Sequence, residues 1–217
     1  MSGALLGALI LAGFGYSAEQ AASGDIPLAL VALQYPPLWV GFVGVPVWAA
    51  ARKGRGWIED FRVRIRFVDV LPAAVIGILL QLVVVPLVSW PFLKASGTSF
   101  DELGESARDL VSRADSNSGL ALMVLLVVIG APLAEELFFR GLLLRAFEKR
   151  FGTAWALAGS SLVFGITHFQ LLQTPALTAA GLGFALLAVR SKRLGPAVVA
   201  HMAFNAVTVA SLALAGP

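Results

Sequence analysis

The chain has 217 residues, of which 58% are hydrophobic and only 13% are charged, and it contains no cysteine. A soluble domain usually carries about twice that share of charged residues, and the mean hydropathy here is +0.84. The composition therefore excludes an ordinary soluble protein, and the lack of cysteine excludes disulfides, thiolate metal ligands and a cysteine nucleophile.

Apolar segments recur along the whole chain, and several have the roughly 17–25 residues that a membrane-spanning helix needs. We expect an all-α fold, a polytopic transmembrane bundle of about seven helices within a single integral membrane domain over residues 1–217. The predicted segments are 3–18, 27–50, 68–93, 119–144, 153–170, 175–189 and 196–214.

The first segment, "MSGALLGALILAGFGYSAEQ", has two interpretations. It resembles a signal peptide in length, but no basic residue precedes its apolar core, as a signal peptide would require. We therefore expect a retained first helix. Removal of this segment would leave six helices with the same orientation.

Basic residues gather in three links, 51–67, 145–150 and 190–193, which share one membrane face if the helices alternate in direction. The positive-inside rule then predicts a cytoplasmic N-terminus and an external C-terminus. The basic pI near 9.7 is thus explained by topology and anionic lipid, without nucleic acid as a partner. Twelve of the 16 basic residues lie in these links: Arg52, Lys53, Arg55, Arg62, Arg64, Arg66, Arg145, Lys149, Arg150, Arg190, Lys192 and Arg193.

The link 94–118 is the one long polar stretch. It ends the N-terminal part of the chain (1–118), which holds the first helices and this segment, and a C-terminal core (119–214) follows. Apolar residues recur at helical spacing over 99–113, behind Ser99 as an N-cap. This pattern predicts an amphipathic helix on the outer surface. Its residues leave open whether it is a solvated connector or a functional lid.

The fourth segment contains "APLAEELFFR", with Glu135, Glu136 and Arg140 in an apolar run. Three isolated charges near the bilayer centre would cost on the order of 8–10 kcal/mol, so they must be paired or face water. Glu136 and Arg140 are four residues apart and can form an ion pair on one helix face. Glu135 is rotated by about 100° from Glu136, so it stays free to act as a general base. The alternative is that all three residues only clamp neighbouring helices.

Pro132 lies one turn before the glutamates. A proline inside a helix removes a backbone donor and kinks the helix, so we expect the motif-bearing fourth helix to be kinked.

Two histidines complete the set of polar residues in the predicted membrane segments. His168 follows Phe164 by four residues, and His201 precedes Asn205 by four, so each pair shares a helix face. Together with the glutamates they offer a base and neutral donors for an oxyanion. Counted at ~1.5 Å per residue from the basic links, Glu135, His168 and His201 lie ~15, ~22 and ~9 Å deep. Tilt, the kink or a protruding fourth helix would have to bring them together.

Three motifs in order, Glu135-Glu136-x-x-x-Arg140, Phe164-x-x-x-His168 and His201-x-x-x-Asn205, resemble the type II CAAX prenyl endopeptidases. The same family includes the CAAX proteases and bacteriocin-processing proteins, also called the Abi family. The resemblance covers residues 119–214, and the earlier helices match only in hydropathy.

The resemblance implies an intramembrane glutamic peptidase that needs no cofactor. Glu135 and His168 would activate water, His201 and Asn205 would hold the oxyanion, and Glu136, Arg140 and Phe164 would support the site. The substrate would be a peptide or protein, membrane-anchored or prenylated in the family's eukaryotic members. Because the chain is rich in Ala and Gly, we expect it in a bacterial cytoplasmic membrane.

Three alternatives remain open at this stage. Glu135, His168 and His201 could bind zinc, since two His and a carboxylate form a known catalytic ligand set, although no HExxH motif is present. The chain could be a non-catalytic immunity or scaffold protein with a polar core that fixes helix packing. A proton-coupled transporter would also place Glu and His in the membrane, but we find no internal repeat.

Overall fold

The computed structural model describes residues 11–17, 26–114 and 116–215. Within these ranges the regular elements are helices, as the sequence predicted, and no strand is formed. The predicted first segment, 3–18, lies mostly outside the described residues.

The second to fourth predicted segments all form helices. The second forms α3 (Leu28–Ala32) and α4 (Tyr35–Lys53), and the link after it contains α5 (Trp57–Asp60). The third consists of α6 (Phe67–Leu79), the π-helical segment η1 (Leu80–Val84) and α7 (Val85–Ser96). The fourth consists of α10 (Asn117–Met123), η2 (Val124–Gly130), α11 (Ala131–Glu136), η3 (Leu137–Leu143) and α12 (Leu144–Phe151).

The last three predicted segments form α13 (Thr153–Ile166), α14 (Thr174–Ser191) and α15 (Gly195–Ala215). Five of the described helices are long and apolar enough to cross a membrane, and α13 is shorter. The sequence prediction placed the end of α13 at 170, which is wrong by four residues. The helix ends early because the Thr167 hydroxyl donates to the Phe164 carbonyl and Phe169 adopts a left-handed backbone, φ 56°.

Near Pro132, where the sequence predicts a kink, the helix contains π-helical turns. Each of η1 and η2 ends just before a proline, Pro86 or Pro132, which has no N–H to donate. The Ala131 N–H bonds to the Leu126 carbonyl, five residues back. The π-helical register thus shifts hydrogen bonds past the missing donor, and such turns are frequent at functional sites.

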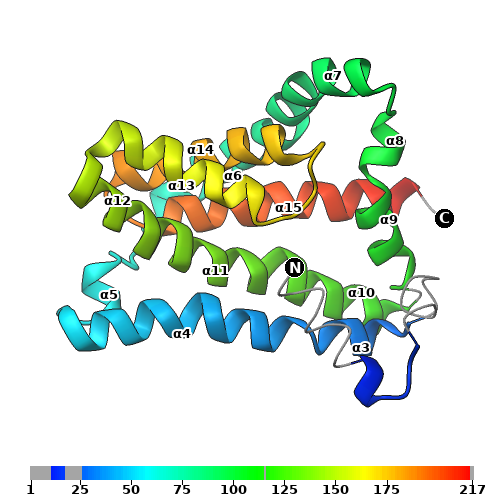
Figure 1. Cartoon of the computed structure of the whole chain (residues 1–217), viewed down its shortest axis with the longest axis horizontal. Helices are drawn as coiled ribbons and strands as arrows, with labels where there is room; N and C mark the ends of the chain where they lie inside the picture. The colour runs from blue at the N-terminus through cyan, green and yellow to red at the C-terminus, as the bar shows by residue number, and fades with distance from the viewer. Residues whose placement is uncertain (1–10, 18–25, 115, 216–217) are drawn as a thin grey trace.

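Helix α15 occupies the centre of the bundle and packs against α6, α14, α11, η2 and α9. The helices run side by side, with α4 along one edge and α7 rising at the opposite one (Figure 1). Helix α6 approaches α15 very closely at Gly77, where an added Cβ would overlap the Ala200 carbonyl oxygen. Small residues at such crossings let helix backbones meet, which is how membrane helices commonly pack.

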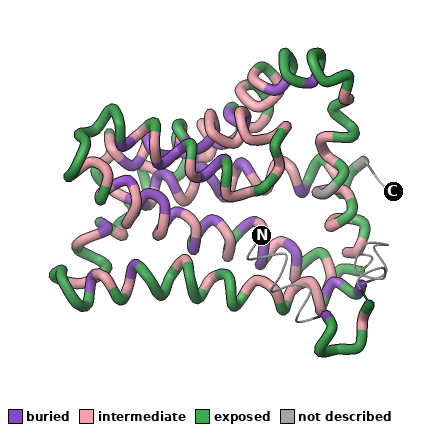
Figure 2. Tube along the Cα trace, viewed as in Figure 1, coloured by how far each residue is buried: buried purple, intermediate pink, exposed green. Residues whose placement is uncertain are grey.

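The outer helices expose large apolar side chains rather than burying them. Figure 2 shows exposed residues along α4 and α7, while buried residues concentrate where α11 and α13–α15 face one another. Leu87 is 72% exposed and Trp48 is 60% exposed. Such an apolar exterior suits contact with lipid, so the chain is an integral membrane protein.

The two ends of the bundle differ in their connections. Helix α5 and the turn after α12 lie at one end, and α8 (Phe100–Leu103) and α9 (Glu105–Ser112) lie at the other (Figure 1). The predicted N-cap is present, because Ser99 and Glu102 form a reciprocal capping box. The predicted amphipathic segment is therefore confirmed as two short helices, which divide at Gly104.

Gly77→Ala should destabilise the protein by about 1–3 kcal/mol, because the new methyl group collides with the α15 backbone. Gly41→Ala is the matched control, since an added Cβ there meets nothing within 4 Å and alanine favours helix. Thermal unfolding of both variants in detergent measures the difference. An equal midpoint for the two variants would contradict the close crossing.

Candidate active site

A buried ion pair joins Glu136 and Arg140, as the sequence spacing predicted. Arg140 Nη1 donates to Glu136 Oε1 over 2.6 Å, and both side chains are 0% exposed. Burial of two charges costs desolvation energy that their mutual attraction only offsets when the geometry is good. The pair therefore depends on the groups that surround it.

Aromatic rings and one carbonyl complete the environment of Arg140. Its Nη2 donates to the Gly181 carbonyl over 2.8 Å, and its guanidinium lies 4.5 Å from the Phe164 ring centroid and 5.3 Å from that of Phe184. Cations bind favourably to ring faces, most strongly when water is excluded. Gly181 leaves space for this arrangement, because an added Cβ would lie 3.2 Å from Nη2 and 3.0 Å from Phe164.

His201 is held by the same carboxylate that binds Arg140. Its Nδ1 lies 2.9 Å from Glu136 Oε1, and its ring stacks on Phe184 with centroids 4.6 Å apart. These two contacts fix the plane of the imidazole. Its second nitrogen, Nε2, consequently lies on the side of Glu135, 3.8 Å from Oε2.

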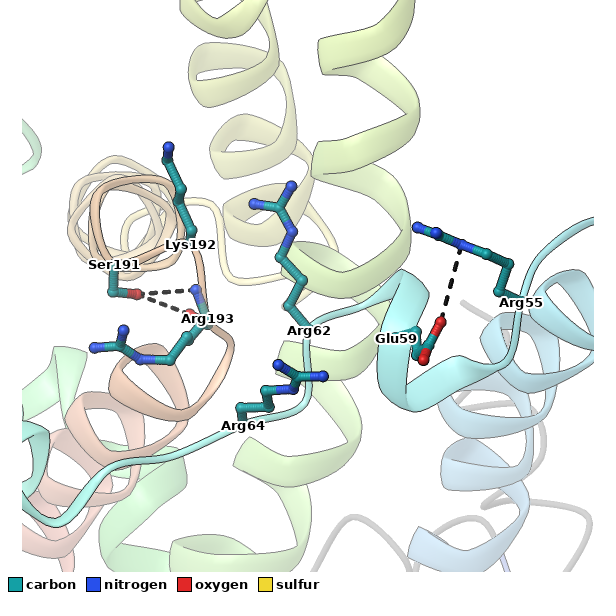
Figure 3. Close-up of a pocket in the computed structure, with 7 residues that line it drawn as sticks. All are labelled: Arg55, Glu59, Arg62, Arg64, Ser191, Lys192 and Arg193. Atoms are coloured by element: carbon teal, nitrogen blue, oxygen red, sulfur yellow. Dashed lines mark hydrogen bonds and ion pairs between the residues drawn. The ribbon is translucent and has the colours of Figure 1, made fainter.

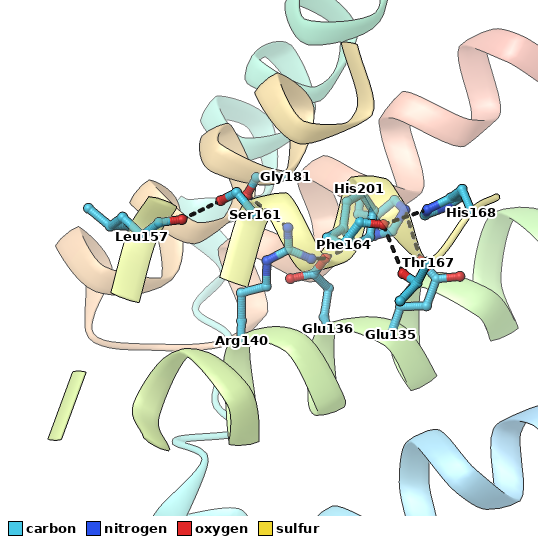
Figure 4. Close-up of polar contacts among 10 residues, drawn as sticks. All are labelled: Glu135, Glu136, Arg140, Leu157, Ser161, Phe164, Thr167, His168, Gly181 and His201. Atoms are coloured by element: carbon cyan, nitrogen blue, oxygen red, sulfur yellow. Dashed lines mark hydrogen bonds and ion pairs between the residues drawn. The ribbon is translucent and has the colours of Figure 1, made fainter. Parts of the chain in front are cut away.

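Glu135 differs from its neighbour in exposure and in hydrogen bonding. Its side chain is 17% exposed and makes no hydrogen bond to a described residue, whereas Glu136 accepts through Oε1 and leaves only Oε2 without a partner. Glu135 forms no ion pair with Arg140, as its angular offset on the helix predicted. Figure 4 shows Glu135, Glu136 and Arg140 projecting from one helix toward Phe164 and His201.

His168 lies in the turn that follows α13 and is oriented by the last turn of that helix. Its Nδ1 lies 2.8 Å from the Phe164 carbonyl. A carbonyl only accepts, so Nδ1 carries the hydrogen and Nε2 of a neutral ring is an acceptor. The Phe164 ring lies between the two histidines, 4.8 Å from His168 and 5.7 Å from His201.

Asn205 lies one turn after His201 on α15 and bonds to the backbone of η2. Its Nδ2 donates to the Val127 carbonyl over 2.8 Å. In a π-helical register that carbonyl would accept from the residue five positions on, which is Pro132. Asn205 therefore satisfies the backbone acceptor that the proline leaves without a donor, and its second N–H remains available.

Comparison with known proteins gives partial matches to this chain. The model of the family "Type II CAAX prenyl endopeptidase Rce1-like" matches residues 117–207. Residues 117–207, less than half of the chain, are therefore similar to the CAAX protease family. A relative in Bacillus subtilis (strain 168), named "Putative membrane peptidase YdiL", is 30% identical over 107 residues. That match covers 49% of this chain and 44% of the relative, so the chain spans less than half of it. No solved structure matches the chain.

The fold brings Glu135 and His201 within 3.8 Å of each other although their predicted depths differ. Glu135 and His168 lie at similar distances along the chain from the turn at Gly152, where α12 and α13 fold back on each other. His201 lies much nearer to the turn that precedes α15. Along the chain, the turn at Gly152 is farther from the site residues than the turn at Lys192 is. This difference offsets the unequal depths that were counted from the sequence.

Some neighbours of the site were not identified from the sequence. Phe184 and Gly181 come from α14, which carries no charged motif before Arg190; its small residues, "TAAGLGFAL", were the only signal of close packing. Tyr35, at the start of α4, lies close enough to Glu135 for the two groups to interact electrostatically. Nothing in the sequence connects Tyr35 with the motifs.

The predicted zinc ligands do not form a metal-binding cluster within the described part of the chain. Glu135 and His201 approach each other, but no group of three His, Asp or Glu side chains there is arranged to hold a metal. A catalytic zinc site normally uses three protein ligands. The zinc hypothesis is left to experiment.

Glu136→Gln and Arg140→Met should each destabilise the protein by about 3–5 kcal/mol, because each leaves a buried charge without its partner. The double variant should lose less than the sum of the two, a coupling that a double-mutant cycle measures. Unfolding in mixed detergent micelles provides the free energies.

The exposed pair Arg55 and Glu59, 3.9 Å apart, is the control and should show little coupling. Additive losses at Glu136 and Arg140 would contradict a shared ion pair.

Proposed function

We propose that this chain is an intramembrane endopeptidase in which water, activated by Glu135 and His168, attacks a peptide carbonyl. The observation that carries the proposal is the contrast between two adjacent glutamates. Glu136 is fully buried and bound to Arg140 and His201, whereas Glu135 is partly exposed, lies 3.8 Å from His201 Nε2 and makes no hydrogen bond to a described residue. A structural clamp would not need the second carboxylate.

Glu135 and His168 each offer an acceptor for a proton of water. Glu135 Oε2 has no donor among the described residues, and His168 Nε2 carries a lone pair because Nδ1 donates to the Phe164 carbonyl. A positioned base of this kind typically contributes about 10²–10⁴-fold to the rate. The proton accepted from water would then pass to the leaving amine.

His201 is suited to stabilise the developing oxyanion. A carboxylate lies near each ring nitrogen, Glu136 at Nδ1 and Glu135 at Nε2, and in the proposed mechanism both nitrogens act as donors. Its Nε2–H would donate to the oxyanion, together with the second N–H of Asn205. Donors held by such a network need no reorganisation during reaction, which is the source of their catalytic effect.

The substrate would be a peptide or protein segment presented from the membrane, with or without a prenyl group. Phe169 and Leu171, in the turn beside His168, are 68% and 87% exposed and offer an apolar contact for it. We place the N-terminus in the cytoplasm and the C-terminus outside a bacterial membrane. The gathering of basic links at one end of the bundle supports that orientation.

An immunity or scaffold role is the second candidate, and one observation favours it. Asn205 bonds to the backbone of η2, and Glu136 and Arg140 are fully enclosed, so these three residues hold helices together whatever else they do. The two proposals differ in what they require of Glu135. Only the peptidase requires its carboxylate.

Glu135→Gln should abolish cleavage, a loss of about 10²-fold or more, while the protein still accumulates in the membrane. The measurement compares peptide termini in membrane fractions of cells with the intact chain or the variant. Glu148→Gln is the control. Glu148 lies in α12, where its carboxylate accepts a hydrogen bond from Thr153, and the variant should retain all cleavage. Identical termini with intact chain and Glu135→Gln, at equal expression, would favour the scaffold.

Cleavage should persist in the presence of a zinc chelator, because the proposed bases are side chains rather than metal-bound water. The test incubates the purified chain with excess chelator and then supplies a substrate identified from the peptide termini. Loss of cleavage that returns on addition of zinc would overturn the metal-free mechanism.

A further inference from the structure

A cavity of about 590 Å³ lies at the basic end of the bundle, away from Glu135 and Glu136. It opens between the link after α4 and the turn that joins α14 to α15. Figure 3 shows its lining side chains around one space. They are Arg55, Glu59, Arg62, Arg64, Ser191, Lys192 and Arg193.

The cavity carries an excess of positive charge that its own walls do not neutralise. Arg193 is bound bidentately to Asp69, at 2.7 and 3.1 Å, and Arg55 lies 3.9 Å from Glu59. The other cations, Arg62, Arg64 and Lys192, form no ion pair with any described residue. Like charges held together repel one another, so an anion in the cavity would be attracted by all three.

Backbone hydrogen bonds hold the two walls of the cavity in place. The Leu194 N–H donates to the Arg62 carbonyl over 3.0 Å, and the Gly195 N–H donates to the Arg64 carbonyl over 3.1 Å. Gly195 permits this approach, because an added Cβ would lie 2.6 Å from the Arg64 oxygen. The two segments that carry the cations are therefore held together by backbone hydrogen bonds and do not form a loose surface loop.

Two of these cations also occupy an unfavourable backbone conformation. Arg62 and Lys192 have φ values of 52° and 54°, in the left-handed region that glycine or asparagine adopts more easily. Phe169, beside His168, is the other non-glycine residue with positive φ in the described ranges. Backbone strain of this kind gathers at functional sites.

Exposed apolar side chains flank the cavity on the same link. Trp57 and Ile58 on α5 are 42% and 49% exposed, and Ile65 and Phe67 are 55% and 93% exposed. Cations interleaved with exposed aromatic and aliphatic residues are typical of a segment at the level of lipid headgroups. This flank favours a lipid over a freely soluble anion.

We propose that this cavity binds the phosphate of an anionic phospholipid, whose acyl chains lie against Trp57, Ile65 and Phe67. Arg62, Arg64 and Lys192 bind the phosphate, as basic pockets between membrane helices do for anionic headgroups. The site goes beyond the proposed peptidase and needs no catalysis, so it is tested by binding alone.

The experiment uses the purified full chain in neutral detergent and titrates phosphatidylglycerol, with native mass spectrometry to count bound lipid. We expect saturable binding that Arg62→Gln/Lys192→Gln weakens about 30-fold, since each interfacial cation contributes to attraction of the headgroup. Lys149→Gln/Arg150→Gln removes the same charge from an exposed basic link outside the cavity, and binding should stay unchanged.

Three outcomes would overturn the proposal: no saturable binding, equal weakening in both double variants, or binding of inorganic phosphate that phosphatidylglycerol does not displace. The last would assign the cavity to a soluble phosphate. Should Arg62→Gln/Lys192→Gln fail to fold, Arg64→Gln, outside the left-handed region, carries the same prediction with a loss of about fivefold.

Discussion

The rest of the site depends on the buried ion pair between Glu136 and Arg140. Neither charge could remain in the apolar centre of the bundle alone, and the carboxylate that neutralises Arg140 also binds His201. One interaction therefore ties α11 and η3 to α15, and the Gly181 carbonyl ties α14 to the same guanidinium. Because Glu136 is bound in this way, the adjacent Glu135 keeps a partly exposed side chain, with its Oε2 buried on the side of His201 Nε2 and without a hydrogen bond to a described residue.

The irregular helix that carries the glutamates is the second constraint. Pro132 removes a donor, η2 changes its hydrogen-bond register, and the Val127 carbonyl accepts from Asn205 instead. The Val127 carbonyl, left without a helical donor, thereby forms a specific contact with α15, one turn from His201. An asparagine at this position serves the packing of the bundle and, in the proposed mechanism, also the oxyanion.

Much of the site was predictable because its contacts are local in sequence. The Glu136–Arg140 pair follows from a four-residue spacing, the isolation of Glu135 from its angular offset, and the cap at Ser99 from the capping-box pattern. The membrane-spanning segments were predictable from hydropathy, since lipid demands continuous apolar helices.

The tertiary contacts were not predictable in the same way. The bond from His201 to Glu136 joins residues 65 apart in sequence, and depth counting separated Glu135 from His201, which lie 3.8 Å apart. The early end of α13 depends on Thr167 and on the left-handed Phe169, which helix periodicity does not reveal. Phe184 and Gly181 carry no chemistry of their own, so only the packed structure shows that they enclose Arg140.

Two adjacent glutamates have separate tasks in the proposed mechanism, and one paired measurement distinguishes them. Stability to unfolding and cleavage of one identified substrate would be measured on the same preparations of Glu135→Gln and Glu136→Gln. We expect Glu135→Gln to keep the unfolding midpoint of the intact chain and to lose cleavage, whereas Glu136→Gln should lower the unfolding midpoint. A Glu135→Gln protein that still cleaves the substrate, or a Glu136→Gln protein as stable as the intact chain, would contradict this expectation.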